Sequence, residues 1–248
     1  MAFIFIDVET RSNVDLPRSG ASKYLSHPYT EIVAVGVIST GDNKVAIYAP
    51  EFPGSSTSDR WQIIHSPPVE RLYTGDTLIA HNAYGFDRPA LIRSDPRYGT
   101  YPWIDTRDMA YTVGCPGGLD ALGDWFGLGR KKSNKGLLNV QKHGKDASVA
   151  SWRDMFDYLA QDVLLLRDIY QRLAPMMPGV PEWEAEFRQV FERINESGIP
   201  IDVDYVIEMM QQWERSKKVA ATKLAEITVG AIEDRKSTRL NSSHVSES

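Results

Sequence analysis

The chain has 248 residues, of which 42% are hydrophobic and 25% are charged, and its net charge is −5. This balance is ordinary for a globular protein of one mid-sized domain with an appendage. The negative charge excludes a uniformly basic nucleic-acid wrapper, although it leaves room for a local basic groove. The sequence contains no apolar run near the roughly 18 residues that cross a bilayer, so we expect no membrane partner. Cys115 is the single cysteine, which excludes an internal disulfide and fits a reducing compartment.

Five short segments are predicted to be strands because they are apolar and rich in β-branched or aromatic residues. They are residues 2–8, 31–40, 44–50, 77–82 and 103–106. Gly41-Asp42-Asn43 makes a tight hairpin plausible between the second and third. Residues 51–68 are rich in proline, glycine and serine, and are predicted to form a long surface loop with at most a short helix around Trp61 to Ile64.

After the fifth strand the pattern becomes helical. Residues 119–128 are amphipathic, and a short helix is expected near Pro89 to Arg93. A longer stripe of buried residues follows the 3-4-3-4 spacing of one helix face: Phe156, Leu159, Val163, Leu166 and Tyr170. The order of strands and helices predicts an α/β fold, with a five-stranded mixed sheet flanked by helices, over residues 1–175.

The C-terminal part is predicted to differ from this domain. Prolines and a glycine at 175–181 interrupt the chain, and residues 182–197 and 203–233 are predicted to be two further helices within a segment at 182–234. Residues 235–248 are serine-rich without apolar periodicity, so we expect them to be disordered. They closely resemble the translation of a ligation adaptor used in DNA sequencing libraries. We therefore expect this tail to be non-native and the natural protein to continue beyond residue 234.

Asp7 and Glu9 lie two residues apart at the end of the first predicted strand, so both side chains should leave the same face. Two carboxylates ~4 Å apart repel by about 4 kcal/mol at an effective dielectric of ~20, so a buried pair requires a cation or a proton. A D-x-E triplet also arises by chance about once in a chain of this size. Taken singly, the pair is weak evidence.

Two further acidic positions follow. His81-Asn82-Ala83-Tyr84-Gly85-Phe86-Asp87 comes directly after the fourth strand, and its N-x-x-x-F-D pattern is uncommon by chance. A helix cap by Asn82 or Asp87 is the structural alternative. Tyr158 and Asp162 lie four residues apart, hence on one helix face, although this spacing by itself is common.

Together these positions bring four carboxylates from two strand ends and one helix into one ordered set. Divalent cations would relieve their repulsion, and an oxygen-only ligand set favours Mg²⁺ or Mn²⁺ over zinc. We therefore predict metal ligands at Asp7, Glu9, Asp87 and Asp162.

FIDVET, HNAYGFD and YLAQD resemble the three motifs of the DEDDy branch of the DnaQ-like 3′→5′ exonucleases, which have the ribonuclease H-like fold. The resemblance covers about residues 1–175, and Asp105-Thr106 and the helix at 119–128 are similar to that family's interior. It implies hydrolysis of terminal phosphodiesters of DNA to nucleoside 5′-monophosphates. It also implies two bound Mg²⁺ ions, for which Mn²⁺ may substitute, and a Tyr158 that orients the attacking water.

Residues 191–202 (FERINESGIPID) are similar to the helix that opens the polymerase portion of family A DNA polymerases. The chain therefore resembles the N-terminal, proofreading part of a phage or bacterial replication polymerase whose polymerase domain is missing. The resemblance implies the cytoplasm of a bacterial or phage-infected cell. The expected partners are a single-stranded or frayed 3′ end of DNA and that missing domain.

Substrate contacts are predicted at Asn82 and Phe86, although Phe86 also fits a place in the core. A basic stretch from 130 to 145 includes Lys131, Lys132 and Lys135, which could guide a single strand, while a solvated loop is the default interpretation. His81 is interpreted as a packed histidine rather than a metal ligand.

Two other functions remain open from the sequence. One is a stand-alone exoribonuclease of the same superfamily, because no motif shows which sugar is accepted. The other is a non-catalytic nucleic-acid-binding or polymerase-docking module with vestigial carboxylates.

Overall fold

The computed structural model of the chain describes all residues except 130–134, 178–186, 188–189, 192, 195–196 and 229–248. The chain divides into two compact units, Met1–Glu192 and Arg193–Ser248. The adaptor-like tail at 235–248 and most of the predicted helix at 182–197 lie outside the described residues.

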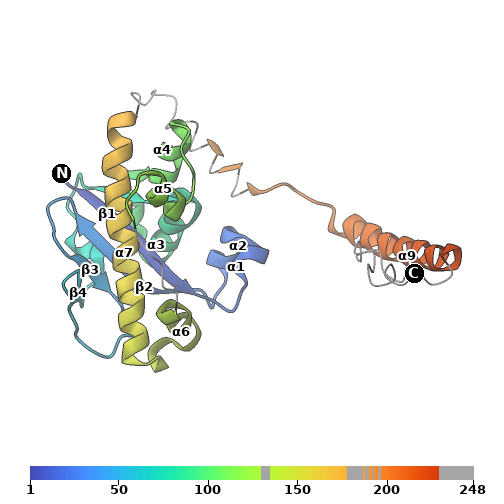
Figure 1. The fold of residues 1–248 in the computed structure, drawn as a ribbon, viewed down its shortest axis with the longest axis horizontal. Coiled ribbons are helices and arrows are strands. Elements are labelled where there is room, and N and C mark those ends of the chain that lie inside the picture. The colour runs from blue at the N-terminus through green and yellow to red at the C-terminus, as the bar shows by residue number, and fades with distance from the viewer. Residues whose placement is uncertain (130–134, 178–186, 188–189, 192, 195–196, 229–248) are drawn as a thin grey trace, which may run out of the picture. The chain divides into compact units, whose positions relative to one another are not determined.

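In its described part, the first unit contains a six-stranded mixed sheet with the strand order β4-β3-β2-β1-β5-β6. The strands are β1 (Phe3–Arg11), β2 (Glu31–Ser39), β3 (Val45–Tyr48), β4 (Trp61–Ile64), β5 (Thr77–Ala80) and β6 (Trp103–Asp105). The pairs β1–β2 and β2–β3 are antiparallel, while β1–β5, β5–β6 and β3–β4 are parallel. The sheet with its flanking helices confirms the predicted α/β class (Figure 1).

The prediction of five strands was wrong, because β4 forms within the segment predicted to be a loop. This edge strand has only four residues and pairs with β3 from Val45↔Trp61 to Tyr48↔Ile64. Trp61 is 2% exposed; its ring lies 5.2 Å from that of Phe156, and its Nε1–H donates to Asp157 Oδ1 at 2.8 Å. Contacts with a distant helix therefore stabilise β4, and a local proline-rich pattern cannot reveal them.

Seven α-helices lie in the described residues of the first unit. They are α1 (Leu16–Ser19), α2 (Ala21–Ser26), α3 (Arg88–Ser94), α4 (Thr106–Thr112), α5 (Leu119–Trp125), α6 (Lys135–His143) and α7 (Val149–Leu173). Short 3-10 turns are η1 (Pro68–Arg71), η3 (Pro96–Thr100), η4 (Gly144–Asp146) and η5 (Ala174–Met176), and η2 (Ala83–Asp87) is a π-helical turn. Helices α3, α5 and α7 were predicted, whereas α1, α2, α4 and α6 were not.

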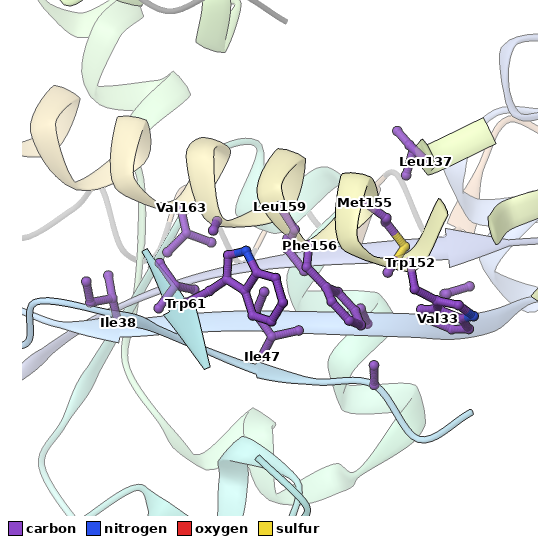
Figure 2. Close-up of a cluster of buried hydrophobic side chains, with 14 of the residues drawn as sticks. Val33, Ile38, Ile47, Trp61, Leu137, Trp152, Met155, Phe156, Leu159 and Val163 are labelled. Atoms are coloured by element: carbon purple, nitrogen blue, oxygen red, sulfur yellow. The ribbon is translucent and has the colours of Figure 1, made fainter. Parts of the chain in front are cut away.

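Helix α7 runs along one face of the sheet and carries the predicted stripe (Figure 1). Ser148 begins it by accepting the Ser151 N–H at 3.1 Å through its side chain. Phe156, Leu159 and Val163 are fully buried, and Figure 2 shows them directed from the helix toward the strands. Each such side chain contributes about 1.5–3 kcal/mol of burial free energy, so this layer is a main source of stability.

The opposite face of the sheet packs a second apolar cluster. Ile6 of β1 and Leu78 of β5 are fully buried there against Leu91 of α3. Tyr98 and Trp103 complete this layer, and the Tyr98 carbonyl accepts the Trp103 Nε1–H at 3.1 Å. The sheet is therefore covered by apolar side chains on both faces.

The second unit contains α9 (Val203–Ile227), which begins where it was predicted; residues 229–233 of that prediction lie outside the described part. The Asp202 side chain caps the helix by accepting the Tyr205 N–H at 2.9 Å. No described residue of α9 is buried, and Trp213 is 65% exposed. Across the described residues, we find no helix with the length and apolar character to cross a membrane.

Candidate active site

The alternating pattern of β1 places Phe5, Asp7 and Glu9 on the face that α7 covers. Asp7 pairs with Gly36 of β2 and Glu9 pairs with Ala34, and directly opposed residues share one face of an antiparallel sheet. Ala34 and Phe5 belong to the core cluster beneath α7. The sequence predicted that the two acids lie at the end of the strand. Pairing with β2 continues to Arg11, however, so both acids lie within β1.

Asp87 comes from a different element and approaches β1 from the side of β5. It ends the π-helical turn η2, is only 3% exposed, and accepts the Val8 N–H at 3.3 Å. Burial and the nearby charge of Asp7 raise the pKa of the Asp87 carboxyl well above its usual range, while the Val8 N–H opposes the shift. Within the described residues its side chain makes no cap bond to α3, so the helix-cap alternative does not hold.

The Asn82 backbone holds a left-handed conformation, with φ 64°, at the start of the same turn. Its N–H donates to Asp105 Oδ1 at 2.9 Å, and its side-chain Oδ1 accepts from Arg107 Nη1 at 2.7 Å. A Cβ at Gly85 would lie 2.3 Å from Asn82 Oδ1, so any other residue there would displace the Asn82 side chain from its bond to Arg107. π-Helical turns are frequent at functional sites. Asn82, which precedes this one, is held through its backbone by Asp105 and through its side chain by Arg107.

Sequence reasoning missed Arg107 and the supporting role of Asp105. Asp105 is buried and begins α4 by accepting the Arg107 N–H at 2.9 Å, besides holding Asn82. Burial is the main cause of the raised pKa of its carboxyl. Only the family resemblance of Asp105-Thr106 pointed to this position, because a buried acid that holds backbone N–H groups has no spacing pattern of its own.

Helix α7 supplies Tyr158 and Asp162 to the same region. Asp162 is 7% exposed and Tyr158 is half-buried. The pKa of the Tyr158 hydroxyl is strongly raised, first by burial and then by the negative charges of Asp162 and Glu9. Tyr158 is also hydrogen-bonded to Asp162, with the phenol as donor to the carboxylate.

The mutual effects of these groups on their pKa values indicate that the five predicted catalytic side chains lie in one region. Tyr158 responds to the charges of Asp162, Glu9 and Asp7, and Asp87 responds to the charge of Asp7. In the described part of the chain, however, no three Asp, Glu, His or Cys side chains are arranged as a group that could hold a metal ion. Like-charged carboxylates repel one another, and a divalent cation would draw them together. The donor chemistry therefore fits Mg²⁺, whereas the side-chain arrangement is not that of a finished coordination shell.

A cavity of about 380 Å³ opens beside Glu9. Its walls include Thr10, Arg11, Tyr24, Phe86 and Gln141. The Phe86 ring lies 6.1 Å from that of Tyr24 and is half-buried, so it both packs against the core and lines the cavity. Gln141 of α6 was not identified from the sequence because its helix was not predicted.

Arg11 lines this cavity, and two carboxylates hold its guanidinium. Its Nη1 and Nη2 donate to the two Glu51 oxygens at 2.7 Å each, and Nη2 also donates to Glu31 at 2.6 Å. The Arg11 guanidinium lowers the pKa of the Glu51 carboxyl. A side chain at Gly144 would collide with Arg11, so the turn after α6 closes tightly over this ion pair.

His81 and the basic stretch complete the predicted positions. His81 Nε2–H donates to the Gly117 carbonyl at 3.0 Å, and Nδ1 lies 3.0 Å from the Thr106 hydroxyl, which confirms a packed histidine. Burial lowers its pKa to about 4. Lys131 and Lys132 lie outside the described residues, and Lys135 is the first residue of α6.

A scan of the sequence against models of protein families gave no match, and a search of curated proteins gave none either. The acidic cluster, the cavity beside Glu9 and the three motifs are therefore the basis for a functional assignment. Each of these features lies in the first unit.

Proposed function

We propose that the chain is a metal-dependent 3′→5′ exonuclease that removes nucleoside 5′-monophosphates from the 3′ end of DNA. The observation that carries this proposal is that the charge of Asp7 acts both on Asp87 of the π-helical turn and on Tyr158, which is hydrogen-bonded to Asp162 of α7, so acids from three separate elements lie near one another. The mixed sheet flanked by helices supports the finer assignment to the ribonuclease H-like fold. Family resemblance supports a proofreading role before a family A polymerase domain.

The proposed metal ligands divide into two sets. Asp7, Glu9 and Asp162 hold one Mg²⁺ or Mn²⁺ ion, and Asp7 with Asp87 holds the second. When bound, such a pair of ions lowers the pKa of an attacking water and stabilises the charge on the leaving 3′ oxygen. The repulsion between Asp7 and Asp87, seen in the raised Asp87 pKa, favours a cation between them.

Tyr158 positions the attacking water and does not act as a base. Its raised pKa keeps the phenol protonated at neutral pH, so it cannot accept a proton there. The phenol oxygen retains lone pairs toward a water while its proton is donated to Asp162. Tyr158→Phe should therefore slow hydrolysis by about 10-fold, the lower end of the effect of a positioning group.

The cavity beside Glu9 is the proposed place of the 3′-terminal nucleotide. Phe86 and Tyr24 offer aromatic surface to a base or sugar, and Glu9 offers a carboxylate to the 3′-hydroxyl. Asn82, whose side-chain oxygen accepts from Arg107, would offer its amide nitrogen to the substrate as a hydrogen-bond donor. Lys131, Lys132 and Lys135 guide the strand by contacts to its phosphates.

Digestion of DNA labelled at the 3′ or the 5′ end tests this function directly. With Mg²⁺, the 3′ label should be released first as a mononucleotide, and EDTA should abolish release. A matched RNA oligonucleotide distinguishes the exoribonuclease, which would degrade RNA faster than DNA. Binding of DNA without any release of mononucleotides would show the non-catalytic module instead.

Asp162→Ala provides the control for a contaminating nuclease. Hydrolysis by this variant should fall by about 10³-fold under single-turnover conditions, because a ligand of the first ion is lost. A rate near that of the unmodified chain would refute the assignment of Asp162.

A further inference from the structure

Gly36 lies in the middle of β2, directly beneath α7. A Cβ at this position would lie 2.9 Å from Leu159 Cγ and 3.0 Å from Val163 Cγ2. Non-bonded carbons approach no closer than about 3.5 Å at their energy minimum, so a methyl group here would require a displacement of about 0.6 Å. Leu159 and Val163 are both fully buried, so the surrounding core resists that displacement.

The backbone conformation does not explain this glycine. Gly36 is absent from the glycines with positive φ in the described residues, so its conformation is open to other residues. A glycine within a strand weakens the sheet and often marks a close approach of another element. Position 36 is therefore occupied by a glycine because a larger residue would leave too little space for α7.

This close approach occurs beside the proposed metal ligands. Gly36 is the cross-strand partner of Asp7, and both face α7. The two helix residues that rest on Gly36 each follow one of the functional residues, Leu159 after Tyr158 and Val163 after Asp162. Figure 2 shows Leu159 and Val163 directed from the helix toward the strands. The two turns of α7 that contact Gly36 are thus the turns that carry Tyr158 and Asp162.

We propose that Gly36 is a positioning residue: its missing side chain sets the separation between α7 and β1 at which Asp162 and Tyr158 work together with Asp7 and Glu9. The inference rests on the proposed function of these acids as metal ligands. A misplacement of about 1 Å in a catalytic site reduces rates by about 100-fold, and disturbed support of ligands weakens metal binding by about 10–100-fold.

Gly123 offers a control, because an alanine there would crowd the same helix, α7, from another element. A Cβ at Gly123 of α5 would lie 3.3 Å from Leu165 Cδ1, so an alanine there also crowds α7. Leu165 belongs to a different core cluster, together with Met109 and Leu122. Gly123→Ala should therefore strain α7 without changing its distance from Asp7.

The test compares Gly36→Ala with Gly123→Ala in the full chain, with Mn²⁺ affinity measured by calorimetry, hydrolysis of 3′-labelled DNA, and thermal unfolding. We expect Gly36→Ala to weaken Mn²⁺ binding by about 10-fold and to slow hydrolysis by about 10–100-fold. Gly123→Ala should keep both within about twofold, since it leaves the ligands in place. Unchanged Mn²⁺ affinity and rate in Gly36→Ala would overturn the inference.

Relief of the crowding gives a second criterion. Leu159→Ala removes the side-chain atom nearest to position 36, while Val163 Cγ2 stays 3.0 Å from it, so Gly36→Ala should weaken Mn²⁺ binding less in the Leu159→Ala background than in the unmodified chain. Equal losses of Mn²⁺ affinity in the two backgrounds would show that the contact with Leu159 does not set the position of α7. If Gly36→Ala does not fold, Val163→Ile enlarges the same contact from the helix side, and normal Mn²⁺ affinity in that variant would refute the inference.

The two proposals can fail separately. Mn²⁺ binding that depends on Gly36, without hydrolysis of DNA, would refute the nuclease and retain the positioning role. Hydrolysis that tolerates Gly36→Ala would retain the nuclease and refute the positioning role. An unmodified chain that neither binds Mn²⁺ nor hydrolyses DNA would refute both.

Discussion

The two faces of β1 are built from alternate residues of the same strand, and they differ in purpose. One face presents Ile4, Ile6 and Val8 to the apolar cluster that includes Leu78 and Leu91. The other begins with Phe5 in the core beneath α7 and then becomes acidic at Asp7 and Glu9. A single strand thus contributes packing on one side and a cluster of charges on the other.

The difference between the two faces indicates how the fold tolerates the repulsion between its clustered carboxylates. The acidic residues follow a fully buried aromatic on their own face, and fully buried aliphatic residues lie on the reverse face. Apolar burial near them supplies about 25 cal/mol per Å², which offsets the desolvation and repulsion of the carboxylates. Changes on the two faces should therefore separate stability from activity.

The largest effect is expected from Asp7, which belongs to both proposed ligand sets. Asp7→Ala should reduce Mg²⁺-dependent hydrolysis by about 10³-fold or more. Its free energy of unfolding should not fall, because the repulsion between Asp7 and Asp87 is removed. Single-turnover digestion and urea unfolding measure the two quantities. A variant that is inactive only because it is unfolded would contradict the comparison.

Ile6→Ala tests the opposite face. Ile6 is fully buried, and truncation of such a residue lowers the free energy of unfolding by about 2–5 kcal/mol. Because Ile6 points away from the acids, the hydrolysis rate per folded molecule should stay within about twofold. Urea unfolding and initial rates well below the melting temperature provide the measurement. A large loss of rate in fully folded protein would show that the two faces are not independent.

His81, which follows β5, is a third test, because here a titratable side chain is buried for structural reasons. Its pKa is lowered to about 4 in the folded state, against about 6.5 in the unfolded chain. The neutral ring's contribution is therefore complete above pH 6.5 and is lost as pH falls toward 4, by about 2–3 kcal/mol. Urea unfolding at pH 7 and pH 4.5 should show a steeper loss in the unmodified chain than in His81→Gln. Parallel losses would contradict this role.

The smallest effect on the free energy of unfolding is expected from Asp87→Asn, which should stabilise the fold where Ile6→Ala destabilises it. The folded Asp87 carboxyl binds its proton more tightly than the unfolded chain does, so stability falls as pH rises above the unfolded pKa. Without added metal, Asp87→Asn should raise the free energy of unfolding at pH 7 by about 1 kcal/mol, a common size for relief of active-site strain. The gain should vanish near pH 3, and hydrolysis should be lost. Thermal unfolding in EDTA across this pH range tests the sign, and a destabilised variant at pH 7 would contradict it.

Elements whose pattern is local could be predicted from the amino-acid sequence. A short apolar run rich in phenylalanine and isoleucine indicated β1, and the 3-4 spacing from Phe156 to Tyr170 indicated α7, because each pattern lies within one element. Spacings of two and four residues predicted that Asp7 shares a face with Glu9 and that Tyr158 shares one with Asp162. These relations require no knowledge of how the elements pack.

Features that depend on residues far apart in the chain became visible only in the folded structure. Strand β4 exists because Trp61 contacts α7, and Asp87 bonds to Val8 instead of capping α3. Asn82 is held by Arg107, which is 25 residues away in the chain, and Gly36 matters through the helix above it. Such contacts join residues without any fixed spacing, so burial and close approach appear only once the sheet and α7 are packed together.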